Sequence, residues 1–508
     1  MNQLKWGVLL SYVSMAAGIA LSLVYTPFML RLLGQSEWGL YSLVASVVGY
    51  LHLLSFGFGG AYVRFYSRAA ASDQEGEIAR VNGLFMVVFS AMSVVTILAG
   101  IVLTTNAGVV LGDKLSPSEV ATARVLMGLM TFTVALSFPA SVFSSFVTVN
   151  ERFVFQRLLQ LARTVATPVV TLMVLLLGYK SIGMAVVAAV IAVAATVVNV
   201  AYCLSKIHMS FSFRGLDLKL MKEISVFSAY IFINMIVDQA NWHVDKFILG
   251  RAGGTVAVAV YAVAAQLSGY YMSLSTTVSA VFVPRVNRLA AVLNDDRELT
   301  RLLTRVGRVQ FLILGLVLSA LIVFGDAFIS MWAGADYKGA YLIALILIIP
   351  VTIPLTQTLG VEIQRAKNMH QFRSWLYLGI AVLNVAVSIP LAQRYGGVGA
   401  AVGTGAALLL GNGLIMNLYY HRRVGLDMRV FWKGILGFVP GLVPVVIAGA
   451  AVMYFVDVDG AVRLLAWGSA YVTVYCASMW LLGMNDYERD LIGRPVARLW
   501  GRWRLSAR

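Results

Sequence analysis

Residues 82–103 read NGLFMVVFSAMSVVTILAGIVL, a stretch without charge that is long enough to cross a bilayer as a helix. The hydrocarbon core of a membrane is about 30 Å thick and needs roughly 20 apolar residues in an α-helix. Stretches of this kind recur along the whole chain, which predicts an all-α polytopic membrane protein. The fourteen predicted spans are 8–30, 39–63, 82–103, 121–147, 154–177, 182–204, 223–249, 257–283, 309–332, 339–363, 373–392, 398–419, 433–456 and 462–484.

The composition fits a chain that lies mostly in lipid. Hydrophobic residues make up 60% of the chain and charged residues 12%, and the mean hydropathy is +0.83. The longest loop between predicted spans covers only 284–308, so no soluble domain of ordinary size fits between them. Both cysteines, Cys203 and Cys476, fall inside spans and form neither a disulfide framework nor a metal motif. We expect them to be buried packing residues.

The basic residues orient the predicted spans. If the N-terminus is cytoplasmic, 29 of the 39 Lys and Arg residues fall in cytoplasmic segments and 9 on the other side. An excess of Lys and Arg on the cytoplasmic side is the usual bias of membrane proteins. It predicts that both termini are cytoplasmic, and it accounts for the net charge of +16 without a nucleic-acid partner. The basic tail, with Trp500 and Trp503, is predicted to lie against the anionic headgroups of membrane lipids.

The chain carries signs of an internal duplication. The stretch from Tyr179 to Ala185 recurs from Tyr395 to Ala401 at an offset of 216, and 28–41 resembles 247–261 at an offset of about 220. Repeats of this kind are typical of transporters whose substrate path lies between the two halves. The predicted organisation is an N-terminal six-helix bundle at 1–206, a cytoplasmic linker at 207–222, a C-terminal six-helix bundle at 223–421, helices 13 and 14 at 433–484, and a basic cytoplasmic tail at 485–508.

The seventh span carries polar side chains spaced 4, 3 and 4 residues apart, which places them on one helix face. They are Asn234, Asp238, Asn241 and Asp245. A carboxylate inside a span costs about 2.5–3.5 kcal/mol on insertion scales, so it usually faces water or a partner. Asp238 is a candidate for ion coupling, either binding Na⁺ with the two asparagines or carrying a proton, although a structural contact to another helix is the alternative. Asp245 lies near the outer end and is predicted to pair with Lys246 or Arg31, or to join the coupling site.

Cationic residues also occur within or beside the spans. Arg163 lies about two turns inside the fifth span and is predicted either to extend to the cytoplasmic surface or to face the cavity. Glu362 and Arg365 share a helix face, where a simple ion pair is the alternative to a cavity role. The candidate cationic cavity consists of Arg31, Arg64, Arg163 and Arg365, with Lys246 and Glu362 as further candidates. Such residues suit a phosphate or pyrophosphate group, and the absence of a Walker A sequence argues against direct drive by ATP.

The first 66 residues resemble the opening of a known transporter family. The residues are Phe28-x2-Arg31-x2-Gly34-x2-Glu37-x-Gly39-x-Tyr41, then Gly57 to Arg64, and the second half matches at Asp245-Lys246-x2-Leu249-Gly250 followed by Tyr261. This pattern is similar to that of polysaccharide and oligosaccharide flippases, including O-antigen flippases, of the multidrug/oligosaccharidyl-lipid/polysaccharide exporter superfamily. The resemblance implies two six-helix bundles in a V around a central cavity, with helices 13 and 14 packed outside.

The same resemblance implies an activity. It implies ion-coupled alternating access that moves an undecaprenyl-pyrophosphate-linked oligosaccharide across the bacterial cytoplasmic (inner) membrane for cell-surface polysaccharide biosynthesis. Arg31 and Arg64 would then be cationic cavity residues, and the region of Asp238 and Asp245 an ion-coupling site. The implied partners are the lipid-linked oligosaccharide, membrane lipids and polysaccharide polymerase machinery, and the expected cofactors are none apart from Na⁺ or H⁺ as the coupling ion.

Two other classes of protein remain as alternatives. A multidrug or metabolite cation antiporter of the same superfamily would favour an aromatic and acidic cavity, so the cationic residues count against it. A membrane enzyme that uses a lipid-linked sugar would need a substantial outer loop with paired carboxylates. The loop at 104–120 contains only Asp113 and Glu119. The sequence therefore predicts a transporter that is not an enzyme.

Overall fold

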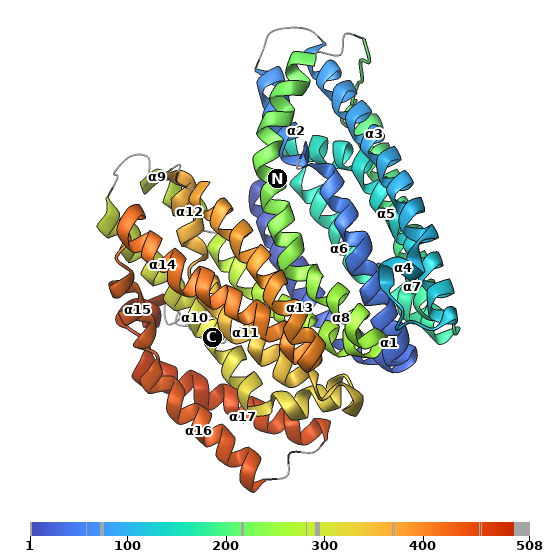
Figure 1. Cartoon of the computed structure of the whole chain (residues 1–508). Helices are drawn as coiled ribbons and strands as arrows, with labels where there is room; N and C mark the ends of the chain where they lie inside the picture. Colours follow the sequence, from blue (N-terminus) through green and yellow to red (C-terminus); the bar gives the residue numbers. More distant parts are fainter. Residues whose placement is uncertain are drawn as a thin grey trace, which may run out of the picture. The chain divides into compact units, whose positions relative to one another are not determined.

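The computed structural model describes residues 3–56, 58–71, 76–214, 218–280, 282–289, 295–367, 369, 371–456, 458 and 460–491. Within these ranges every regular element is a helix and no strand occurs. The predicted all-α class is therefore confirmed. Figure 1 shows the helices in chain order, and their contacts divide the chain into two compact units. The first unit contains 1–262 and 377–403, and the second contains 263–376 and 404–508.

The first unit contains the N-terminal helices together with the first part of a long helix, α8, and part of α13. Its elements are α1 (Gln3–Gly49), the 3-10 helix η1 (Tyr50–Ser55), α2 (Phe58–Ala70), α3 (Glu77–Thr105), α4 (Ala107–Leu111), α5 (Pro117–Val149), α6 (Phe153–Leu176), α7 (Lys180–Ser205), α8 (Leu218–Ala280) and α13 (Gln371–Leu408). Helix α5 packs against α3 and α7, and α1 packs against α6 (Figure 1).

The outer face of α3 shows how this unit suits a membrane. The helix buries Phe85 and Phe89, which are 1% and 2% exposed. Its opposite side exposes Leu98, Ile101 and Val102, each by more than half of its surface. An apolar surface of this extent would be costly in water but is solvated by lipid tails.

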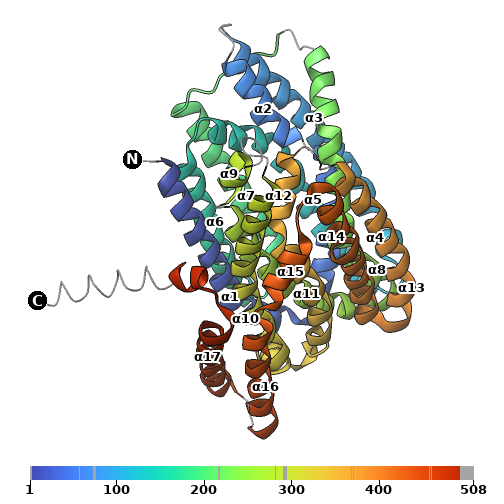
Figure 2. The same ribbon diagram turned by 90° about the vertical axis from the view of Figure 1, so that its left-hand side faces the viewer.

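The second unit is arranged around α10. Its further elements are the end of α8, α9 (Val283–Arg288), α10 (Asp296–Trp332), the 3-10 helix η3 (Ala335–Tyr337), α11 (Ala340–Thr356), α12 (Thr358–Ala366), the π-helices η4 (Leu409–Ile415), η5 (Tyr420–Val424) and η6 (Met479–Gly483), α14 (Met416–Tyr419), α15 (Met428–Leu436), α16 (Val439–Phe455) and α17 (Ala461–Ser478). Helices α16 and α17 lie side by side (Figure 2) and both pack against α10. Buried Phe324, Phe438, Tyr471 and Met479 form the core of this contact.

The described residues contain ten helices long and apolar enough to cross a membrane, or up to eleven if the bent pair α11–α12 counts as one span. Helices α1, α8 and α13 each cover two predicted spans, which a turn at a glycine separates. Gly34 in α1 has φ +78°, Gly254 in α8 has φ +74°, and Gly396 in α13 has φ +58°. The polytopic membrane class is confirmed, whereas the count of fourteen and the arrangement in bundles stay predictions.

Backbone features recur at the offset of the predicted duplication. Gly34 and Gly254, which are 220 residues apart, both have a positive φ. Lys180 and Gly396, which are 216 residues apart, also both have a positive φ. Two hydrogen bonds at helix ends also recur, both at an offset of 217. The bond from Arg152 N to Val147 O recurs as the bond from Met369 N to Gln364 O. The bond from Met209 N to Cys203 O recurs as the bond from Leu426 N to Tyr420 O. These recurrences support the duplication through conformation, where sequence identity between the copies is weak.

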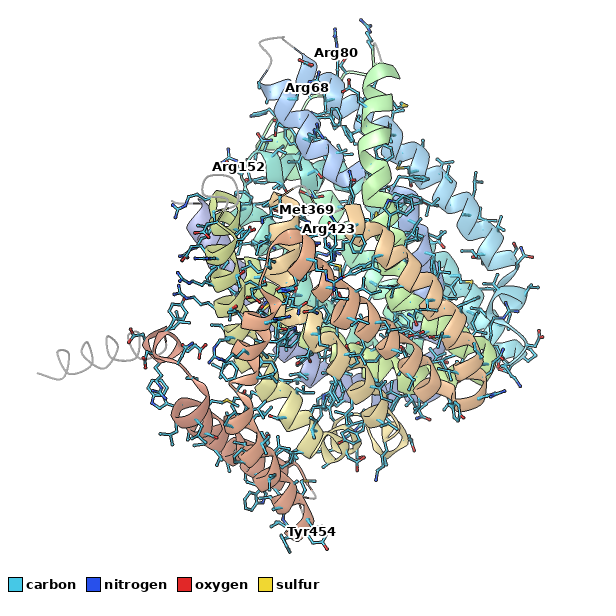
Figure 3. All side chains as sticks on the ribbon, turned by 60° about the vertical axis from the view of Figure 1, so that its left-hand side comes forward. Arg68, Arg80, Arg152, Met369, Arg423 and Tyr454 are labelled. Atoms are coloured by element: carbon cyan, nitrogen blue, oxygen red, sulfur yellow. The ribbon has the colours of Figure 1, made fainter. Side chains whose placement is uncertain are left out.

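The segments predicted to lie on one side of the membrane gather at one end of each unit. Figure 3 shows Arg68, Arg80 and Arg152 together at one end of the first unit. Within the second unit, Met369 and Arg423 lie together, and Tyr454 lies at the opposite end. This sorting agrees with the predicted alternation of loops, and the assignment of one end to the cytoplasm stays a prediction.

The bend at Gly254 generates the first testable prediction. Its backbone conformation, φ +74° with ψ −169°, is essentially restricted to glycine. Gly254→Ala should therefore reduce the free energy of unfolding by roughly 1–3 kcal/mol and lower Tm in detergent. Gly269 is the matched control, because it lies in the same helix and a Cβ there meets no atom within 4 Å. Gly269→Ala should leave Tm unchanged or raise it, and equal losses in both variants would contradict the strain argument.

Candidate functional site

A group of polar side chains lies inside the first unit where α1 ends against α8. A Cβ atom on Gly49 would lie 2.9 Å from Nε2 of Gln239 and 3.8 Å from the ring of His243. The two helices therefore approach each other where glycine leaves room. Among the described residues, Nε2 of Gln239 and Nδ1 of His243 are buried without a hydrogen-bond partner. Buried polar atoms without partners are rare and require a specific explanation.

Titratable residues extend this polar group. His243 lies within electrostatic reach of His52 in η1 and of Lys246 in α8. The carboxylate of Asp245 lies within electrostatic reach of Lys246 and of Tyr50. Ionisable side chains inside a membrane span are costly, and they commonly mark ion pathways or proton relays. We refer to Tyr50, His52, Gln239, His243, Asp245 and Lys246 as the α8 site.

Asp245 has a structural partner that the sequence did not suggest. Its side chain is 2% exposed, and the hydroxyl of Tyr261 donates a hydrogen bond to its Oδ2. Tyr261 lies beyond the bend at Gly254, so this bond joins the two arms of α8. Of the predicted ion-pair partners, Lys246 interacts with Asp245 electrostatically. Asp245 thus links the two arms of α8 at the bend and belongs to the α8 site.

The remaining predicted ion-coupling residues lie further towards the start of α8. Asn234, Asp238 and Asn241 share one face of this helix, since their spacing is 4 and 3 residues. Their side chains lie outside those that the structure describes. Their predicted binding of Na⁺ or of a proton therefore stays a prediction.

The predicted cationic residues come from both units. Arg31 in α1, Arg64 in α2 and Arg163 in α6 belong to the first unit, and each is exposed. Arg365 belongs to the second unit, where its Nη1 donates a hydrogen bond to Glu362 at 2.8 Å. This pair has the i,i+3 geometry of the simpler alternative that the sequence left open. The roles of all four arginines in binding substrate stay predictions.

Sequence reasoning missed a network beside the bends at Gly34 and Gly254. The carboxylate of Glu119 accepts hydrogen bonds from Ser36 at 2.7 Å and Thr255 at 2.9 Å, and also from the backbone of Ser116. Three segments far apart in the sequence are joined in this way. The pattern Ser116-x-x-Glu119 is a helix capping box, which the sequence could have revealed.

The two copies of the duplicated motif also touch in this region. A Cβ on Gly39 would lie only 1.8 Å from the carbonyl oxygen of Thr255, so no other residue fits there without movement. Nearby, Ser181 donates a hydrogen bond to Glu37, whose carboxylate lies 4.0 Å from the ammonium of Lys180. Gly39 and Glu37, which belong to the motif of the first 66 residues, therefore have a packing role that the sequence alone did not assign.

A buried ion pair in the second unit was also missed. Arg308, expected in a cytoplasmic loop, is 8% exposed and binds Glu488, which is 1% exposed, with an Nη2–Oε2 distance of 2.8 Å. Its guanidinium also donates to the carbonyl oxygens of Gly434 and Gly483 and lies 4.2 Å from the ring centroid of Phe438. These contacts bind the segment after η6, which contains Glu488, to α10.

Comparison with known proteins identifies the family. The family model described as "Polysaccharide biosynthesis protein" matches residues 5–290, more than half of the chain. The chain belongs to this family. The similar proteins include the uncharacterized membrane protein EpsK of Bacillus subtilis (strain 168), 24% identical over 494 residues that cover 93% of this chain and 94% of EpsK. A putative O-antigen transporter of Shigella flexneri is 20% identical over 399 residues, which cover 77% of this chain and 92% of that protein.

The chain has the same fold as several transporters of known structure. The lipid II flippase MurJ in an inward closed conformation matches with a TM-score of 0.75 and 15% identity, covering 96% of this chain and 99% of MurJ. An inward-facing multidrug resistance MATE family transporter of the MOP superfamily matches with a TM-score of 0.64 and 12% identity, covering 82% and 99%. The predicted resemblance to the flippase branch of this superfamily is confirmed.

The bond between Tyr261 and Asp245 generates a second prediction. Tyr261→Phe removes one donor from a buried carboxylate and should reduce the free energy of unfolding by about 1–3 kcal/mol. Adding Asp245→Asn to Tyr261→Phe should cost less than Asp245→Asn alone, because the two side chains interact directly. Tyr179, which is 65% exposed, serves as the control, and Tyr179→Phe should leave Tm unchanged. Strictly additive losses in the double variant would contradict a direct interaction.

The pair of Arg308 and Glu488 generates a third prediction. Glu488→Gln should leave a buried guanidinium without its counter-charge and reduce the free energy of unfolding by about 3–5 kcal/mol. Glu298→Gln is the matched control, because Glu298 pairs with Arg301 at the surface, where the side chains are 38% and 66% exposed. The control should change the free energy by less than about 1 kcal/mol. Thermal unfolding in detergent measures both, and similar effects would overturn the assignment of a buried pair.

Proposed function

We propose that the protein moves a lipid-linked oligosaccharide across the bacterial cytoplasmic membrane for the synthesis of cell-surface polysaccharide. The observation that carries this proposal is the family match over residues 5–290, joined to the fold of a lipid flippase over 96% of the chain. The putative O-antigen transporter of Shigella flexneri, which is similar over 77% of the chain, supports the same class of cargo.

The proposed cargo is a glycan linked to undecaprenyl pyrophosphate. Arginine recognises phosphate oxygens through paired hydrogen bonds and keeps its charge at all physiological pH values. Arg31, Arg64 and Arg163 are exposed on helices of the first unit and supply such groups. Arg365, which is engaged with Glu362, would contribute after its ion pair rearranges.

The proposed energy source is an ion gradient that drives alternating access. Asp238, with Asn234 and Asn241 on the same face of α8, would bind Na⁺ or a proton and reset the transporter after each cycle. Asp245 and Lys246 would support this region as a fixed charge pair, since Asp245 is already held by Tyr261. The proposal places both termini in the cytoplasm and includes polysaccharide polymerase machinery as a partner that receives the exported glycan.

A second candidate function is the export of drugs or metabolites in exchange for a cation. The MATE family fold, matched with a TM-score of 0.64, favours this alternative. The exposed arginines argue against it, because a cationic substrate would be repelled by them. Neither function needs catalysis, and we propose that the protein is not an enzyme.

The decisive experiment examines cells that lack the protein. Undecaprenyl-linked glycans are extracted, identified by mass and assigned to a leaflet by their accessibility to an added glycosidase. We expect a complete repeat unit to accumulate on the cytoplasmic side. Normal glycan export together with altered resistance to cationic dyes would favour the antiporter, and truncated glycans would favour an enzyme.

Arg64 generates the fourth prediction. Arg64→Ala should abolish surface glycan while the protein remains in the membrane, because the pyrophosphate loses a cationic partner. Arg68→Ala is the matched control on the same helix, since Arg68 pairs with Glu223 at 3.1 Å in an exposed position. It should export glycan at the wild-type level. Export by Arg64→Ala at that same level would overturn the proposed cationic cavity.

A further inference from the structure

The buried pair of Arg308 and Glu488 fixes an exposed aromatic ring at one edge of the second unit. The carboxylate of Glu488 binds Arg308 and accepts a hydrogen bond from the backbone N–H of Asn485, and the N–H of Glu488 donates to Oδ1 of Asn485 at 3.0 Å. These bonds hold the turn that follows η6 against α10 (Figure 2). Tyr487, the residue before Glu488, is 40% exposed and therefore has a defined position beside α10.

The guanidinium of Arg305 lies over this ring. Its central carbon is 5.0 Å from the ring centroid of Tyr487, which is within the range of a cation–π interaction. The ring is not an acceptor for the in-plane N–H groups that arginine offers to phosphate oxygens. Arg305 is exposed, and within the described ranges its N–H groups have no hydrogen bond or ion pair. The ring thus orients a cation whose donors stay available.

The acids around Arg305 are already paired with other arginines. They pair as Glu298 with Arg301, Glu488 with Arg308, and Asp486 with Arg489. Arg305 has no such partner in the part of the chain that the structure describes. Its positive charge is therefore not neutralised by the protein, and it suits an anion from outside the chain.

Both sides of this contact lie at the same boundary of the membrane. Arg305 precedes the predicted span 309–332 by about one helical turn, and Tyr487 follows the predicted span 462–484 by about one turn. Apolar side chains are exposed on the adjoining parts of both helices, with Ile313 in α10 at 38% and Leu482 in η6 at 57%. An anion at Arg305 that carries acyl chains would place those chains along apolar surface.

We propose that Arg305 and Tyr487 bind the phosphate of an anionic phospholipid headgroup. Arginine forms paired hydrogen bonds with phosphate oxygens, and tyrosine is enriched at membrane interfaces. Arg305 belongs to a segment predicted to be cytoplasmic, and the cytoplasmic leaflet attracts basic residues through its anionic lipids. The bound lipid is a resident of the membrane and not the exported cargo. It would stabilise the turn after η6 on α10.

The experiment uses the purified full-length protein in phosphatidylcholine nanodiscs that contain rising fractions of phosphatidylglycerol. Tm is measured, and the phosphatidylglycerol retained by the protein is counted by native mass spectrometry. We expect Tm to rise and saturate as the retained lipid does. Inorganic phosphate, added to pure phosphatidylcholine nanodiscs at equal ionic strength, should not raise Tm. An equal rise with inorganic phosphate would identify a site for free phosphate and overturn the proposal.

Matched variants locate the bound headgroup. Arg305→Gln should weaken the retention of phosphatidylglycerol about tenfold, because it removes a charge-assisted hydrogen bond. Arg305→Lys keeps the charge without the paired donors and should fall between Arg305→Gln and the wild type. Tyr487→Phe keeps the ring and should retain the lipid, whereas Tyr487→Leu should weaken its retention.

Arg80→Gln is the control for a general effect of charge. Arg80 is exposed in the first unit (Figure 3), so this variant loses the same charge far from the proposed headgroup along the chain. It should retain phosphatidylglycerol as the wild type does. Equal losses in Arg80→Gln and Arg305→Gln, or full retention in Arg305→Gln, would overturn the proposal. Neither result bears on the proposed export function, because no transport is measured.

Discussion

The structure depends on one constraint, which is that lipid offers no hydrogen bonds to polar groups. A polar side chain within a span is therefore costly unless another group of the protein bonds to it. In the first unit, Tyr62 donates to Asn82 at 2.6 Å, and Asn82 in turn donates to the carbonyl oxygen of Ser210 at 3.0 Å. In the second unit, Arg308 is enclosed by Glu488 and backbone carbonyls. Such bonds join helices that apolar packing alone would hold with less specificity, because lipid tails are as apolar as leucine.

The same constraint accounts for the surroundings of three departures from regular helix. Turns at Gly34 and Gly254 are buttressed by side chains from other segments, with Glu119 bonded to both Ser36 and Thr255. The break at Gln357 is lined by hydroxyls and a glutamine, which replace the lost helical bonds. At these three places polar side chains surround the irregular backbone, as expected for membrane depth.

The sequence predicted the polytopic membrane class, because hydropathy acts over whole segments, and it indicated the family through the motif residues of its two halves. It predicted less of the partners of single residues. The spacing in α8 placed Asp245 on a face, and the predicted spans left a turn at 250–256. Helical periodicity does not show that this turn brings Tyr261 against Asp245. Arg308 was assigned to a loop by its position between spans, since charge counting does not show that Glu488 returns from far along the chain to meet it.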